Sequence, residues 1–175
     1  MPEAMAPEDR DIQPASRIGL EFGALALRAA DPLPPLLELI AGLPGLTERR
    51  QELFVVLSEL FYNALDHGLL GIDSSIKDQE DGFERFYQLR ESRRASLAEG
   101  SIRLDVEVRP RPSGPGGEVR ISVEDSGPGF DLERELPRFE QNLGAAGRGI
   151  PLVRSLCREM RFAPPGNRVE VVYVW

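Results

Sequence analysis

The stretch that most constrains the fold of this chain is QELFVVLSELFYNALDHG, residues 51–68. Apolar side chains recur in it at helical spacing and define one apolar face, formed by Leu53, Leu57, Leu60 and Ala64. Three polar residues, Glu59, Asn63 and His67, are spaced four positions apart and therefore share a second stripe along the helix. A carboxylate and an amide on a largely buried helix are unfavourable unless something pairs with them. The helix therefore predicts either a binding site or a solvated edge.

Both interpretations of the polar stripe are open at this point. A carboxylate that can accept a proton, one turn from an amide oxygen that can bind a hard cation, fits a magnesium-nucleotide site. A surface helix with scattered polar residues accounts for this stretch equally well. Other parts of the chain have to distinguish the two.

Composition favours one soluble globular unit and excludes several functions. The chain has 175 residues, 41% of them hydrophobic, which suffices for one core and one domain. Its net charge of -8 makes nucleic acid an unsuitable partner, because phosphate binding needs a basic surface. Cys157 is the only cysteine, so an internal disulfide and a thiolate zinc cage are excluded. We expect a buried structural thiol within a helix.

The ends of the chain and its hydropathy indicate a cytoplasmic setting. Residues 1–16 are rich in Pro, Ala and acidic side chains, and we expect a disordered leader or linker there. They lack the pattern of a signal peptide, and no apolar run approaches the length that spans a membrane. Residues 17–175 are then predicted to form the single domain.

Hydrophobic periodicity predicts an order of elements along this domain. Strands are expected where apolar and polar residues alternate, and helices where apolar residues recur every three or four positions. Asp31 and Thr47 are predicted to cap the first two helices. The expected order is a strand from Ile18, a helix from Asp31, a helix from Thr47 to Asp66, a polar helix over 82–98, strands over 102–108 and 119–123, a lid, a helix over 149–161 and a final strand over 168–175. This order predicts a two-layer α/β (α+β) sandwich, with helices on one face of a mixed, mainly antiparallel sheet.

A second motif, EDSGPGFD, occupies residues 124–131. Asp125 follows a predicted strand, and Gly127 and Gly129 let the backbone approach a ligand closely. A carboxylate fixed at this point can accept a hydrogen bond from an exocyclic amine such as that of adenine. Taken alone, the motif is equally an ordinary turn after a strand.

A third motif, GAAGRGIPLV, occupies residues 144–153. Gly147 and Gly149 precede a predicted helix, whose free N–H groups and dipole favour an anion. Arg148 could add a charged donor to a phosphate group. Glycine-rich helix starts are common, so this motif by itself is weak.

Together, the three motifs resemble the ATP-binding motifs of the gyrase, Hsp90, histidine-kinase and MutL (GHKL) superfamily. They are E-x-x-x-N-A-x-x-H-G, D-x-G-x-G-F and G-x-G-I-x-L-V, and they occur here in the expected order. The resemblance implies the Bergerat ATP-binding fold, with Glu59 as general base, Asn63 as magnesium ligand and Asp125 as the carboxylate that binds adenine. It further implies a lid over 131–147 and an ATP site completed by Gly127, Gly129, Phe130, Gly147, Arg148, Gly149 and Ile150.

Within the superfamily, the chain looks like the anti-sigma-factor serine/threonine kinases of bacterial partner-switching systems. His67 is the only histidine, and no histidine-bearing dimerisation hairpin precedes the domain, so His67 is expected to act locally. The segment DHGLLGIDSSIK resembles kinase-like domains fused to response-regulator and PP2C-type phosphatase modules. The implied partner is a small anti-sigma-antagonist-like protein, with a sigma or anti-sigma factor as another candidate, and a homodimer is compatible. An ATP-gated binding module and a plain ATPase are the alternatives.

Overall fold

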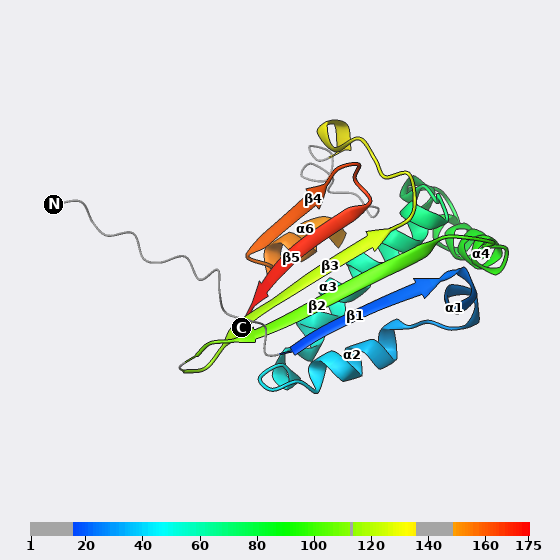
Figure 1. Ribbon diagram of the computed structural model, residues 1–175. Helices are drawn as coiled ribbons and strands as arrows, with labels where there is room; N and C mark the ends of the chain where they lie inside the picture. Colours follow the sequence, from blue (N-terminus) through cyan, green and yellow to red (C-terminus); the bar gives the residue numbers. More distant parts are fainter. Residues whose placement is uncertain (1–15, 113, 136–148) are drawn as a thin grey trace.

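The computed structural model describes residues 16–112, 114–135 and 149–175. Along the described chain one strand is followed by four α-helices, then by two strands, one helix and two final strands (Figure 1). Their bounds are β1 Ser16–Gly23, α1 Ala24–Ala29, α2 Leu33–Ala41, α3 Arg50–Asn63, α4 Gly82–Ala95, β2 Ser101–Pro110, β3 Gly117–Asp125, α6 Gly149–Leu156, β4 Glu159–Ala163 and β5 Arg168–Val174. The expected leader lies outside the described residues, apart from Ser16, which begins β1.

The described strands form one five-stranded sheet in the order β1-β2-β3-β5-β4, and every pairing is antiparallel. Alternation decides which side chains face the core. Ile102, Leu104 and Val106 of β2 are fully buried, whereas the residues between them are not. Their partners on β3 show the same alternation, with Val106 opposite Ile121. Because apolar residues occupy every second position of these strands, the sheet has one apolar face, which the helices cover.

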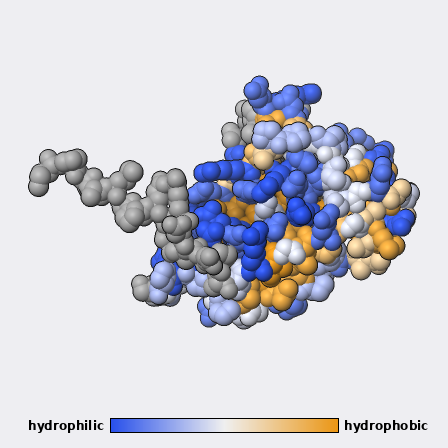
Figure 2. Space-filling model, viewed as in Figure 1, coloured by the Kyte–Doolittle hydropathy of each residue, from blue (hydrophilic) through white to orange (hydrophobic). Residues whose placement is uncertain are grey.

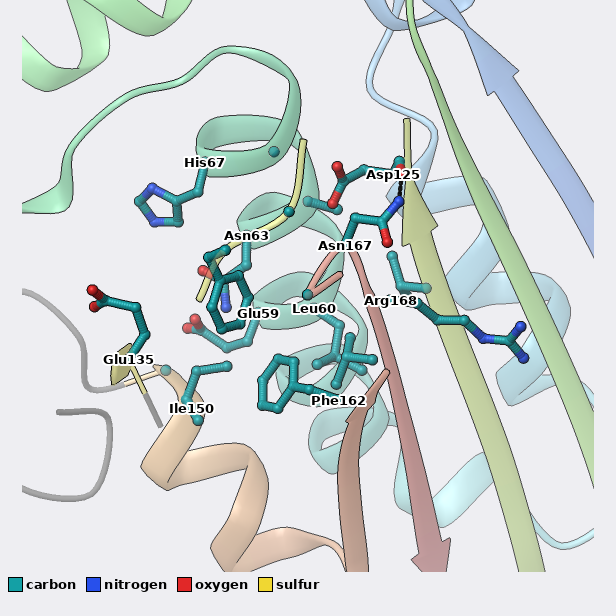
Figure 3. A pocket seen from close by; sticks show the side chains of 18 of the residues that line it. Glu59, Leu60, Asn63, His67, Asp125, Glu135, Ile150, Phe162, Asn167 and Arg168 are labelled. Atoms are coloured by element: carbon teal, nitrogen blue, oxygen red, sulfur yellow. Dashed lines mark hydrogen bonds between the residues drawn. The ribbon is translucent and has the colours of Figure 1, made fainter. Parts of the chain in front are cut away.

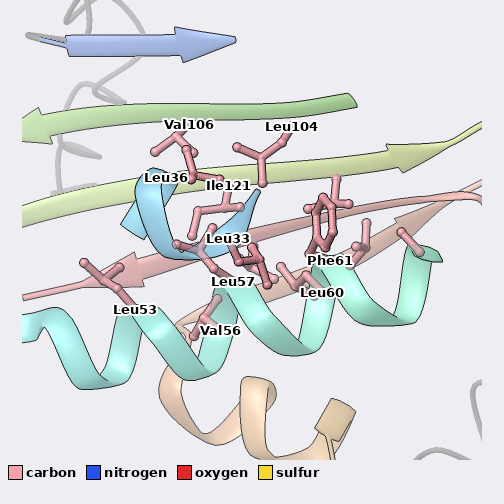
Figure 4. Close-up of a cluster of buried hydrophobic side chains, with 14 of the residues drawn as sticks. Leu33, Leu36, Leu53, Val56, Leu57, Leu60, Phe61, Leu104, Val106 and Ile121 are labelled. Atoms are coloured by element: carbon pink, nitrogen blue, oxygen red, sulfur yellow. The ribbon is translucent and has the colours of Figure 1, made fainter. Parts of the chain in front are cut away.

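The helices cover that face only, as Figure 1 shows. Leu53, Val56, Leu57 and Leu60 of α3 are at most 1% exposed and pack towards the sheet (Figure 4). Helices α2 and α6 flank α3 on this face. The predicted two-layer α+β sandwich is confirmed. Among the described residues, none of the helices combines the length and apolarity needed to cross a membrane.

The other face of the sheet is hydrophilic and open (Figure 2). It carries ion pairs between neighbouring strands, such as Arg17–Asp105 at 3.9 Å and Arg103–Glu21 at 4.0 Å. Exposed pairs of this kind contribute little to stability, because solvent and salt screen them. The core and the site therefore lie on the helical side.

The central helix differs from its prediction at both ends. Thr47 does not cap it; a 3-10 turn, Thr47–Arg49, precedes α3, and the Thr47 hydroxyl donates to the carbonyl of Ala41 instead. At the other end the helix continues as a π-helix, Ala64–Leu69, in which Leu70 N donates to Leu65 O at 2.8 Å. The N-cap position of α2 is Pro32 and not the predicted Asp31, although the Asp31 carboxylate accepts a hydrogen bond from Leu33 N, the first residue of the helix.

The predicted helix over 149–161 is wrong in its second half. Helix α6 ends at Leu156, and Glu159–Ala163 form the edge strand β4, which pairs with β5. Cys157 therefore lies just after the helix and not within it, although it is buried as expected. Burial raises the pKa of its thiol to about 11, so the thiol stays protonated and unreactive at neutral pH.

Candidate functional site

A cavity of about 450 Å³ opens at one end of the sandwich. Figure 3 shows that α3 and its π-helical extension form one wall, while the ends of β3 and β5 and the start of α6 form the others. Seven of the residues predicted for an ATP site line it, namely Glu59, Asn63, Asp125, Gly129, Phe130, Gly149 and Ile150. Three segments far apart in the sequence are thus brought to one cavity.

Glu59 and Asn63 project into this cavity from successive turns of α3 (Figure 3). Burial raises the pKa of the Glu59 carboxyl, and the positive charge of Lys77 partly opposes this. The carboxylate packs against the first residue of α6, because a Cβ at Gly149 would overlap Glu59 Oε2. Glycine at this position therefore lets the start of α6 approach the carboxylate.

Asp125 is a buried carboxylate at the end of β3, with 8% of its surface exposed. Its Oδ1 accepts a hydrogen bond from Gly127 N at 2.8 Å. Its backbone is fixed from the turn before β5, because Asp125 N donates to Asn167 O and Asn167 Nδ2 donates to Asp125 O (Figure 3). Burial raises the pKa of Asp125 to about 6, and the Gly127 hydrogen bond lowers it in part. The carboxylate is thus held in place, and it is ionised at neutral pH.

Glycines shape the cavity where backbone segments meet. A Cβ at Gly127 would lie 2.7 Å from Asp125 Oδ1 and would overlap the carbonyl of Gly68. Gly129 has a φ of 73°, and a Cβ there would lie 2.7 Å from the carbonyl carbon of Pro165. Phe130 follows, and its ring meets Phe162 edge-on at 5.5 Å. Side chains larger than hydrogen at 127 and 129 would separate these segments.

Parts of the predicted phosphate region lie outside the described residues. These are Gly147, Arg148 and the predicted lid after residue 135. Of the residues that begin this lid, Glu135 lines the cavity. The described portion of the third motif begins at Gly149, which starts α6 beside Glu59.

Sequence reasoning left out several lining residues, and four of them matter here. Gly68 and Asn167 hold Asp125, while Phe162 lies on β4, most of which was predicted as helix. The fourth, Lys77, belongs to the 3-10 helix Ser74–Asp78, here called η3. Only Lys77 carried a usable signal, because it is the sole lysine of the chain. His67, expected to act locally, has Nδ1 2.5 Å from the carbonyl oxygen of Ile72, to which it donates.

A buried ion pair ties α4 to the back of the site. Arg90 Nε lies 2.8 Å from Asp66 Oδ1, and both side chains are mostly buried. Burial raises the pKa of Asp66, and Arg90 is the strongest opposing influence. The Arg90 guanidinium also stacks 4.2 Å from the ring centre of Tyr62, whose hydroxyl donates to Asp31 at 2.6 Å. This network fixes the segment that leads into Gly68.

All three motifs fall within the match of one protein-family model. The model of the histidine kinase-like ATPase domain family matches residues 38–173. The chain belongs to the histidine kinase-like ATPase domain family. ATP is therefore its ligand, and the GHKL superfamily expected from the motifs is confirmed. Comparisons with curated proteins and with solved structures gave no match for this ATPase domain.

Proposed function

We propose that this ATPase domain is an ATP- and magnesium-dependent serine/threonine protein kinase of the anti-sigma-factor type. Its substrate would be a hydroxyl group on a small anti-sigma-antagonist-like protein. The observation that carries the proposal is the pair Glu59 and Asn63, a proton acceptor and an oxygen ligand that face one cavity. A domain that only bound ATP would have no need of a base at this position.

In this proposal, adenine binds at Asp125, whose carboxylate accepts a hydrogen bond from the exocyclic amine. Gly127 and Gly129 leave room for the base. The phosphates then extend towards the start of α6, where Gly149 and Ile150 line the cavity. Free backbone N–H groups at a helix start suit phosphate. Gly147 and Arg148 would border the same phosphates.

The residues present fit magnesium. Among the described residues no cluster of three or more His, Cys, Asp or Glu side chains forms a metal cage. Magnesium in nucleotide sites needs none, because one or two protein oxygens and the substrate phosphates suffice. The amide oxygen of Asn63 would supply such a ligand. The ion would neutralise developing charge on the phosphates.

Glu59 would accept the proton of the attacking hydroxyl as the oxygen approaches the γ-phosphorus in line. Partial burial raises its pKa above that of an exposed glutamate, which strengthens it as a base. The remaining catalysis would come from positioning and charge neutralisation.

The phospho-acceptor would come from another protein. The only histidine of the chain, His67, is hydrogen-bonded to the backbone at Ile72, which supports a local role for it. The partner class rests on the resemblance of the chain to the anti-sigma kinases, and more narrowly on that of DHGLLGIDSSIK to kinase-like domains fused to response-regulator and PP2C-type phosphatase modules. A homodimer is compatible with that class.

Incubation of the chain with γ-labelled ATP, magnesium and candidate partner proteins tests the proposal. Label on a serine or threonine of a partner is the expected result. Release of free phosphate at the same rate with and without partners would instead identify a plain ATPase. Partner binding that depends on ATP without any transfer would identify an ATP-gated binding module. Phosphohistidine on the partner would overturn the serine/threonine assignment.

A further inference from the structure

Among the described residues that line the cavity, negatively charged side chains outnumber positively charged ones. Four described carboxylates line it, contributed by Glu59, Asp73, Asp125 and Glu135. The nucleotide that belongs there brings several further negative charges on its phosphates. Such a site binds a polyphosphate only if positive groups lie near the phosphate end. Magnesium supplies part of this charge, and side chains have to supply more.

Two lysine or arginine side chains of the described residues line the cavity, Lys77 and Arg168. The Arg168 guanidinium is directed away from Glu59 and Asn63 (Figure 3). It forms an ion pair with Glu170 on its own strand β5 and another, at 4.0 Å, with Glu124 on the neighbouring strand β3. Lys77 instead lies on the side of Glu59, close enough for its charge to act on that carboxylate.

The segment that carries Lys77 to the cavity is fixed by hydrogen bonds to its neighbours. The loop before it is fixed by Ile72, whose carbonyl accepts from His67 and whose N–H donates to Asp66 O at 2.8 Å. Arg93 of α4 donates to the carbonyls of Leu70 and Gly71 at 2.7 and 2.8 Å. The backbone that leads into η3 is thus held on both sides.

Helix α4 supports η3 directly. Its first residue, Gly82, packs so closely that a Cβ there would overlap the carbonyl of Ile76. The buried ring of Phe86, 1% exposed, lies 3.9 Å from Lys77 Nζ. A ring face holds an ammonium group weakly and offers its N–H donors no conventional hydrogen-bond acceptor. The Lys77 ammonium therefore keeps its donors available for an anion.

We propose that Lys77 binds the phosphate chain of ATP, carried to the cavity by the segment between α3 and β2. This inference rests on the proposed use of the cavity as the ATP site. In the nucleotide-bound protein the Nζ donors would contact phosphate oxygens beside Glu59, while Phe86 continues to support the side chain. Segment 70–100 would thereby contribute directly to nucleotide recognition.

Binding measurements with a nucleotide series test this. We expect Lys77→Met to weaken ATP binding about 10- to 100-fold, the range for a lost charged hydrogen bond, and to leave AMP binding unchanged. Lys77→Arg should keep most of the ATP affinity. Arg103→Met is the matched control, since it removes one positive charge from the open face of the sheet, where Arg103 is 61% exposed. Its ATP affinity should equal that of the unmodified chain.

Because Lys77 is the only lysine, chemical labelling gives an independent test. An ATP derivative acylated on its γ-phosphate transfers its acyl group to a neighbouring amine. The Nζ–acyl amide bond forms, the bond between acyl carbon and phosphate oxygen breaks, ATP leaves, and the amine proton goes to solvent. Mass spectrometry should find the acyl group on Lys77, and excess ATP should prevent labelling.

The outcomes separate this inference from the proposed function. Equal ATP affinities for the chain and Lys77→Met, together with labelling that ATP does not reduce, would overturn the role of Lys77 alone. Parallel losses of ATP and AMP affinity in Lys77→Met would also overturn it, because they indicate general damage to the site. If the chain carrying both Asp125→Ala and Asn63→Ala bound ATP as tightly as the unmodified chain, the proposed site itself would be wrong.

Discussion

The Cα of Gly68, at the end of the central helix, packs directly against the carboxylate of Asp125. A Cβ at position 68 would lie 2.5 Å from both carboxylate oxygens. This contact joins the first and second sequence motifs, and it sets the direction in which the carboxylate can accept a hydrogen bond. Several consequences of the site can be measured.

We expect Gly68→Ala to weaken ATP binding by about 1.5–3 kcal/mol, the worth of a hydrogen bond to a charged group, because the methyl group displaces the Asp125 carboxylate. Isothermal titration calorimetry measures the effect. Gly23→Ala is the matched control, since a Cβ there meets nothing within 4 Å. Unchanged ATP affinity in Gly68→Ala would mean that Asp125 does not bind adenine.

Glu59→Ala should bind ATP normally and lose phosphoryl transfer. Removal of a positioned general base lowers the rate by ~10²–10⁴-fold. Transfer to the partner and nucleotide affinity are measured on the same sample. Glu48→Ala removes an exposed carboxylate that precedes the same helix and should leave both unchanged. Transfer by Glu59→Ala at the normal rate would contradict the assignment of the base.

Asn63→Ala should lose the part of ATP affinity that depends on magnesium. Titrations with and without the ion measure this part directly. In the unmodified chain magnesium should strengthen ATP binding, whereas in Asn63→Ala the two affinities should coincide. A magnesium effect of full size in the variant would show that Asn63 is not the ligand.

The pKa of Asp125, about 6 in the folded chain against 3.8 for an unperturbed aspartate, predicts two opposite effects of pH. ATP affinity should fall as the pH drops through about 6, because the protonated carboxyl no longer accepts the adenine hydrogen bond. Stability should change the other way. Between pH 3.8 and 6 the Asp125 carboxyl is protonated in the folded chain and ionised in the unfolded chain. Its contribution to the free energy of unfolding is therefore fully present below pH 3.8 and is lost as the pH rises through about 6.

Asp125→Asn should therefore be more stable than the unmodified chain at pH 7.5, by about 3 kcal/mol, since the pKa rises from 3.8 to about 6 and each pKa unit corresponds to about 1.4 kcal/mol. The gain should disappear near pH 4. Urea denaturation at both values measures it. Asp105→Asn, on the open face of the sheet, is the control. A loss of stability at pH 7.5 would contradict the burial argument.

Arg90→Met should destabilise the fold by about 3 kcal/mol, because it leaves the buried Asp66 carboxylate without its partner. The double variant Asp66→Asn with Arg90→Met should recover much of this loss. Arg94→Met on the same helix breaks only an exposed pair with Glu91 and should change stability by less than about 1 kcal/mol. Equal losses of stability in Arg90→Met and Arg94→Met would show that the buried ion pair contributes no more to stability than the exposed one.

The parts of the fold that local patterns control were predictable. Ile102, Leu104 and Val106 alternate with charged residues, and the strand that they predict is present. Leu53, Leu57 and Leu60 likewise indicated the buried face of α3. In both elements one face is buried along the whole length, so the period of the sequence matches the period of the structure.

Strand β4 was missed because its sequence continues the period of α6. Met160 follows Leu156 by four residues, which is helical spacing. Pairing with β5, where Met160 lies opposite Val171, overrides that local signal. Asn167 was missed for a similar reason. Its amide holds Asp125, 42 residues earlier, and no local pattern encodes a contact of that range.

The π-helix Ala64–Leu69 has a consequence for which sequence changes the chain can tolerate. A π-turn holds one residue more than an α-turn, so loss of a single residue here would restore ordinary helical bonding. The same deletion would rotate Gly68 by about 100° around the helix axis and turn it away from Asp125. A shorter version of this segment could thus fold well and still fail as a nucleotide site. Residue count between Asn63 and Gly68 should therefore be constant wherever this pocket is used.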